Sequence, residues 1–123
     1  MKLSIEVIYF FLLSLAVAVL HLFYMNFGFY WTMPWVDSSV HFLGGMWVAF
    51  IFHIIFVIYF SGKSTGNIRL SIYSVILVGL LWEAFEVFIG TADFYSHSYP
   101  IDFLSDMTFD FLGGVCFYLL VRK

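Results

Sequence analysis

The chain has 123 residues, of which 63% are hydrophobic, 24% are aromatic and 11% are charged. A soluble protein with so few polar residues would be unable to cover its surface, so this composition excludes an ordinary soluble domain and indicates a bilayer as the solvent. The formal net charge of −3 and the five basic residues exclude a basic surface for nucleic acid. The single cysteine, Cys116, excludes an internal disulfide.

Four apolar segments follow one another along the chain, separated by short polar connections. They cover residues 3–25, 38–60, 70–89 and 101–121. Each has about 20 residues or more, which is enough for a helix to cross a hydrocarbon core of about 30 Å. Because backbone groups in lipid must find partners inside the protein, we expect these segments to be helical. The sequence therefore predicts one all-α domain over residues 1–123, an integral membrane four-helix bundle.

The first segment also has features of a secretory signal peptide. Met1-Lys2 precedes the apolar run, and Ala16 and Ala18 resemble a small-residue cleavage site. The apolar character continues to Met25, however, which is longer than the apolar region of a signal peptide. We therefore expect this segment to remain in place as the first transmembrane helix.

The basic residues predict how the chain is oriented. If the four helices alternate in direction, one side of the membrane carries Lys2, Lys63, Arg69, Arg122 and Lys123. Connections rich in lysine and arginine stay in the cytoplasm. We therefore expect a multi-pass protein of the cell (inner or cytoplasmic) membrane. Both termini would be cytoplasmic, and the connections at residues 26–37 and 90–100 would lie outside.

The last segment carries three aspartates at intervals of four residues, Asp102, Asp106 and Asp110. At 100° per residue they lie on one helix stripe about 80° wide. A charged side chain at the centre of the bilayer costs about 2.5–3.5 kcal/mol, so carboxylates inside a span are typical of a functional site. Asp102 follows Pro100 closely and has an alternative role, because an acid near a helix start interacts favourably with the helix dipole.

Polar residues of the second and third segments fall at the same outer depth. Asp37 and His41 are four residues apart and Glu83 and Glu86 are three apart, so each pair shares one helix face. Asp37 has an alternative role as the N-cap of its helix. Capping does not explain Glu83 or Glu86, because acids near a helix C-terminus oppose the dipole. We expect the three segments to enclose an acidic site that opens to the outside.

Glycine pairs lie next to these polar residues along the second and last segments. Small residues let neighbouring membrane helices approach closely, so we assign a packing role to Gly44, Gly45, Gly113 and Gly114. Residues 37–45 and 106–114 also share the pattern Asp-x-x-x-His/Asp-Phe-Leu-Gly-Gly at a distance of 69 residues. A parallel repeat of two helical hairpins would explain this similarity, and coincidence is the open alternative.

A bound cation would compensate the charge of these carboxylates. Carboxylate oxygens together with one imidazole suit Mn²⁺, Mg²⁺, Ca²⁺ or Zn²⁺. The predicted metal ligands are His41, Glu86, Asp106 and Asp110. Glu83 and Asp106 are the candidates for a general base, so Asp106 has two possible roles. Asp37 and Asp102 are predicted to support the site.

These motifs resemble two families of small bacterial membrane proteins. Asp37-x-x-x-His41-Phe at the head of a helix is similar to the VanZ-like proteins. Trp82-Glu83-x-x-Glu86 and the aspartate series are similar to the YjdF-like proteins. The resemblance covers the last three segments and implies a polytopic bundle with an acidic site. The chain lacks the VanZ-like arginine between the glutamate motif and the last segment, and it is shorter than typical YjdF-like members.

Three classes of function remain open. The first is a metal-dependent hydrolase or phosphatase that acts on a lipid-linked substrate. The second is a non-catalytic binding or assembly subunit that recognises a cationic ligand or partner. The third is a cation or proton transporter, which the nearly apolar inner halves of the second and last segments disfavour. The sequence predicts contact with membrane lipid, and it leaves both enzymatic activity and oligomeric state open.

Overall fold

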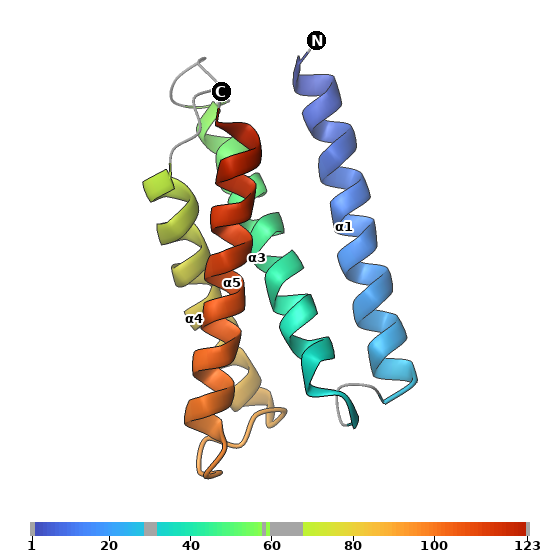
Figure 1. Cartoon of the computed structure of the whole chain (residues 1–123), viewed down its shortest axis with the longest axis vertical. Helices are drawn as coiled ribbons and strands as arrows, with labels where there is room; N and C mark the ends of the chain where they lie inside the picture. Colours follow the sequence, from blue (N-terminus) through green and yellow to red (C-terminus); the bar gives the residue numbers. More distant parts are fainter. Residues whose placement is uncertain (1, 29–31, 58, 60–67, 123) are drawn as a thin grey trace.

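A computed structural model describes residues 2–28, 32–57, 59 and 68–122 of the chain. Helices make up the regular structure of these residues (Figure 1). They are α1 (Lys2–Asn26), α3 (Pro34–Phe56), α4 (Ile68–Ile89) and α5 (Tyr99–Val121). All four are long and apolar enough to cross a membrane, which confirms the predicted all-α chain with four candidate spans.

All four described helices begin earlier than hydropathy predicts, and the shift is largest for α3. α3 begins at Pro34, and proline is favoured in the first helical turn because its missing N–H needs no partner there. This start places Asp37 inside the first turn of α3 and not at its N-cap. α5 begins at Tyr99, with Asp102 in its first turn. The predicted end of the second segment, residue 60, lies outside the described residues.

α3 is the central helix of the bundle. It packs against α1 on one side and against α4 and α5 on the other, and α4 also packs against α5 (Figure 1). Among the described helices, α1 contacts α3 alone. The start of α1 and the end of α5 lie at the same end of the bundle (Figure 1). The cytoplasmic location of that end stays a prediction.

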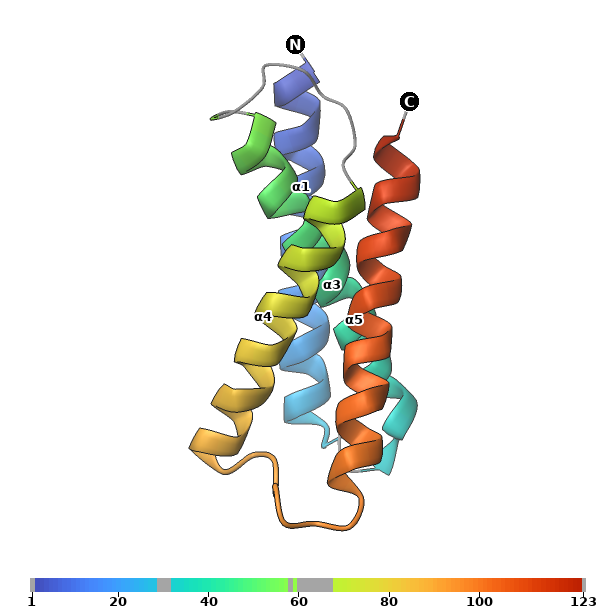
Figure 2. The same cartoon turned by 90° about the vertical axis from the view of Figure 1, so that its left-hand side faces the viewer.

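α4 and α5 diverge toward the connection between them (Figure 2). α4 ends at Ile89 and is followed by Gly90, whose φ of 80° belongs to the left-handed region that favours glycine. The Gly90 N–H donates to the Val87 carbonyl at 3.2 Å, and the Thr91 N–H donates to the Glu86 carbonyl at 3.0 Å. These bonds satisfy carbonyls in the last turn of α4, so the chain leaves the helix after Ile89 and turns toward α5.

α3 and α5 approach each other backbone to backbone. A methyl group on Gly45 would overlap the main-chain carbonyl of Asp110, and a methyl group on Gly113 would overlap that of Phe42. Any side chain at either glycine would force the helices apart. The two glycines therefore set the distance between the polar faces of α3 and α5.

The other two glycines of these pairs have different surroundings. A methyl group on Gly114 would lie 2.9 Å from Cγ2 of Val75 on α4, so Gly114 allows α4 and α5 to pack closely. Gly44 has no described atom within 4 Å of the position that a methyl group would take. Gly44 therefore does not act as a packing residue between the described helices.

The two halves of the bundle have different interiors. Toward the end of α3 lies an apolar core, in which the rings of Phe50 and Phe117 are 5.4 Å apart. Toward the other end, where α3 and α5 begin and α4 ends, the buried side chains include His41, Glu83, Asp106 and Asp110. The buried carboxylates and His41 therefore gather at one end of the bundle, whereas the buried His53, Ser71 and Ser74 lie in the other half.

Candidate metal site

His41 lies at the centre of the polar end and is 8% exposed. Its Nδ1 is 3.2 Å from Oδ1 of Asp110 on α5. Its Nε2 is 3.7 Å from Oδ1 of Asp37, one turn earlier on α3, and 3.7 Å from Oδ1 of Asp106 on α5. One imidazole therefore faces three carboxylates from two helices.

Helical spacing and glycine contacts together produce this arrangement. Asp37 and His41 are four residues apart on α3, and Asp106 and Asp110 are four residues apart on α5, so each pair lies on one face. The close approach at Gly45 brings the two faces together, because its α-carbon lies directly against the backbone of Asp110. The cluster depends on the α3–α5 contact as much as on the polar residues themselves.

Asp37, His41 and Asp106 are placed to hold a metal ion. Each offers one ligand atom, and these atoms lie within 4.8 Å of one another. Ligand atoms that share one ion are each about 2.0–2.2 Å from it, so they lie within about 4 Å of one another. Small side-chain movements would therefore bring the three groups onto one ion.

Asp110 contacts the other nitrogen of the imidazole. A metal-bound histidine almost always donates its second ring N–H to a carboxylate, carbonyl or water, which fixes the orientation and tautomer of the ring. Asp110 is in position to accept this hydrogen bond from Nδ1 of His41 at 3.2 Å. With the proton on Nδ1, Nε2 presents its lone pair toward Asp37 and Asp106.

Glu83 adds a carboxylate from α4. Its side chain is 4% exposed, and its Oε1 is buried without a hydrogen-bond partner among the described residues. Glu83 lies within electrostatic range of His41 and of the aspartates around it. A buried carboxylate oxygen without a partner costs free energy. This oxygen is suited to a proton donor or a cation inside the cluster.

The cluster differs from the predicted ligand set. The group of three potential ligands contains His41 and Asp106, for which the sequence predicts ligand roles, and Asp37, for which it predicts a supporting position. Asp110 instead faces Nδ1 of His41. The reason is the earlier start of α3, which puts Asp37 on a helical turn directly above His41.

Two predicted site residues lie at the rim of the cluster. Glu86 is half-buried near the end of α4, and Asp102 is exposed in the first turn of α5. Glu86 is within electrostatic range of His41, and Asp102 is within range of Asp37. Neither belongs to the group of three potential ligands.

Gly79 of α4 also borders the cluster. A methyl group at this position would lie 2.8 Å from Oδ2 of Asp110, so α4 can pack here only with glycine or after a shift of the carboxylate. Gly79 precedes Glu83 by four residues and shares its helix face. This spacing indicates from the sequence that Gly79 lies on the same side of α4 as the cluster.

A family model described as "Predicted membrane protein (DUF2238)" matches residues 2–123. The chain belongs to this family. The match includes all four helices, in agreement with their capacity to cross a membrane. No curated protein and no solved structure matches the chain. The description names neither the VanZ-like nor the YjdF-like proteins, so that resemblance stays a prediction.

The family description names a membrane protein but no activity. The function of the chain must therefore be inferred from the chemical groups of the cluster. Three carboxylates surround one imidazole, and a fourth carboxylate is buried nearby. Such an excess of negative groups favours a cationic occupant. A set of three protein ligands leaves further positions on an ion for water or substrate, as in catalytic metal sites.

Proposed function

We propose that this membrane protein binds a divalent metal ion at the polar end of its bundle. Asp37, His41 and Asp106 are the ligands, and Asp110 orients the imidazole. The observation that carries the proposal is the group of three ligand atoms within 4.8 Å of one another. The buried Oε1 of Glu83, which has no hydrogen-bond partner among the described residues, supports it independently, because a nearby cation would offset the cost of burying that oxygen.

The donor set narrows the choice of ion. Two carboxylates and one imidazole suit Zn²⁺ or Mn²⁺. Mg²⁺ and Ca²⁺ prefer oxygen ligands throughout, so the central imidazole makes them less suitable. The described residues contain one such group of potential ligands, which favours a site for a single ion over a two-metal centre.

The reaction that best fits this site is hydrolysis of a lipid-linked substrate, for example at phosphorus. A metal ion here would supply Lewis-acid activation of water or of a phosphoryl oxygen. Glu83 would take the proton from the attacking water and return it to the leaving oxygen as the P–O bond to that oxygen breaks, because its buried carboxylate oxygen has no described partner and lies near the ligands. Asp110 holds the proton on Nδ1 of His41 and so keeps Nε2 directed at the ion.

A non-catalytic binding or assembly subunit is the alternative. In that role the same cluster would bind a cation, or a cationic group of a partner, without turnover. Transport is less suitable, because the buried polar side chains in the described part of the other half are His53, Ser71 and Ser74, with no buried carboxylate to continue a relay.

Elemental analysis of the purified full-length protein tests the metal site. We expect about one ion per chain in the wild type and a large loss in His41→Ala and Asp106→Asn. Asp102→Asn is the matched control, because it makes the same change one turn earlier on α5 at an exposed position. A folded wild-type protein without metal, or equal metal in all four proteins, would overturn the proposal.

A further inference from the structure

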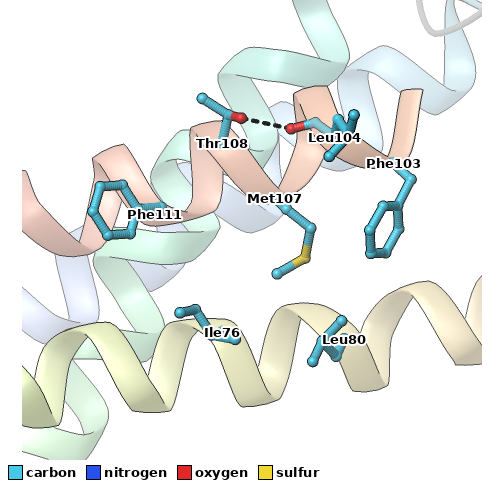
Figure 3. A pocket seen from close by; sticks show the side chains of 7 residues that line it. All are labelled: Ile76, Leu80, Phe103, Leu104, Met107, Thr108 and Phe111. Atoms are coloured by element: carbon cyan, nitrogen blue, oxygen red, sulfur yellow. Dashed lines mark hydrogen bonds between the residues drawn. The ribbon is translucent and has the colours of Figure 1, made fainter. Parts of the chain in front are cut away.

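An apolar groove lies along the contact between α4 and α5 (Figure 3). Ile76 and Leu80 of α4 form one wall, and Phe103, Met107 and Phe111 of α5 line the other. The cavity has a volume of about 390 Å³. This is at the lower end of the range for small-molecule sites, about 300–1,000 Å³.

The walls of the groove present almost only hydrocarbon. The single polar side chain in its lining, Thr108, donates its hydroxyl to the Leu104 carbonyl at 2.6 Å (Figure 3). This bond satisfies the Thr108 hydroxyl within α5, so the remaining part of the Thr108 side chain, its methyl group, is apolar. Both helices are long and apolar enough to cross the bilayer, so acyl chains surround the groove. A lipid hydrocarbon chain is therefore the occupant whose chemistry fits.

Met107, which lines the groove, lies close to the proposed metal site. A methyl group on Gly79 would lie 3.1 Å from Sδ of Met107, in the groove, and 2.8 Å from Oδ2 of Asp110, in the cluster. Met107 also lies between Asp106 and Asp110 in the sequence. The groove and the cluster are thus two faces of the same stretch of α5, at the same depth in the bundle.

Two carboxylates are exposed at the end of the bundle where α4 and α5 diverge (Figure 2). There the side chain of Asp37 is 43% exposed, and Asp102 in the first turn of α5 is exposed. The flexible thioether of Met107 can change rotamer at little cost. A lipid at this position can therefore keep its chain in the groove while its head group approaches His41.

We propose that the groove binds the hydrocarbon chain of a lipid whose phosphate head group occupies the metal ion at His41. This inference rests on the proposed function, because the carboxylates of the cluster would repel a phosphate in the absence of the ion. It deepens that function by naming the substrate class, a lipid phosphate bound through both its chain and its head group.

Two tryptophan variants of α5 test the groove. Leu104→Trp fills it, whereas Leu120→Trp adds the same side chain on the same helix outside the groove. The two leucines are matched in exposure, at 63% and 64%. The probes are oleoyl lysophosphatidic acid, which has one chain, and glycerol 3-phosphate, which has none. Their dissociation constants are measured by calorimetry on the metal-loaded full-length protein in phosphatidylcholine nanodiscs.

For the wild type we expect the chain to tighten binding at least about tenfold over glycerol 3-phosphate, from burial of its methylenes. Leu104→Trp should remove most of this gain, and Leu120→Trp should retain it within about twofold. Metal content is measured on the same samples. If metal is present and both variants bind the probe equally, bulk lipid fills the groove and the inference is wrong, while the metal site stands. If the wild type holds no metal, the proposed function and the inference both fail.

Discussion

The imidazole of His41 and the carboxylate of Asp110 face each other across the α3–α5 contact, with 3.2 Å between Nδ1 and Oδ1. The two residues are 69 positions apart. They are equivalent members of the matching segments 37–45 and 106–114. Each segment therefore supplies one half of a histidine–carboxylate pair. The repeat itself stays a prediction, but this contact gives the second segment a reason to carry an aspartate where the first has a histidine.

In the proposed site Asp106 binds the ion and Asp110 orients the imidazole of His41. Substitutions of these two residues should therefore lower the metal affinity to different extents. Asp110→Asn keeps an oxygen that accepts from Nδ1 of His41, so we expect a loss of about 10–100-fold, as for other groups that orient a ligand. Asp106→Asn removes a charged ligand and should cost more. Competition with a chelator of known affinity measures both. An equal or larger loss in Asp110→Asn would instead make Asp110 a direct ligand.

The neighbouring glycines of α3 predict opposite effects on stability. Gly45→Ala places a methyl group against the carbonyl of Asp110 and should destabilise the protein by about 1–3 kcal/mol, the usual cost of overpacking. Gly44→Ala meets open space and should stabilise α3 by up to about 1 kcal/mol. Unfolding in mixed micelles measures both free energies. Equal effects at the two positions would contradict the backbone contact between α3 and α5.

The attachment of α1 can be weakened without disturbing the metal site. Trp47 of α3 donates its indole N–H to the hydroxyl of Ser14 on α1. Ser14→Ala should cost about 0.6–1.5 kcal/mol in unfolding free energy. Metal content should not change, because the described cluster residues come from α3, α4 and α5. Ser39→Ala is the control, since the Ser39 hydroxyl donates to a carbonyl of its own helix. Metal loss in Ser14→Ala would contradict this separation.

The fold could be predicted from sequence largely because hydropathy determines which segments enter a bilayer. The depth of the polar residues followed from the same pattern. Their direction around each helix did not, because it depends on which helices touch, and hydropathy contains no information on contacts. The positions of Asp37, which joins the group of potential ligands, and of Asp110, which faces Nδ1 of His41, show this limit. So does Gly44, which has the same neighbours in sequence as Gly45 but lies in open space.

The orientation in the membrane is testable with single cysteines in a Cys116→Ser background. His97 lies in the connection between α4 and α5, Arg122 follows α5, and both are exposed. With both termini in the cytoplasm, a membrane-impermeant maleimide should label His97→Cys in intact cells. Arg122→Cys should be labelled only after permeabilisation. The reverse pattern would place the cluster at the cytoplasmic side.

The coordination of an ion by His41 is the central claim, and pulsed electron paramagnetic resonance on the Mn²⁺-loaded protein tests it most directly. The wild type should show the modulation of one directly bound imidazole nitrogen, because Nε2 of His41 faces the same space as Asp37 and Asp106. His53→Gln should retain that signal, since His53 lies on α3 outside the group of potential ligands. His41→Gln should lose it. Stoichiometric Mn²⁺ without nitrogen modulation in the wild type, or with modulation that persists in His41→Gln, would contradict the account.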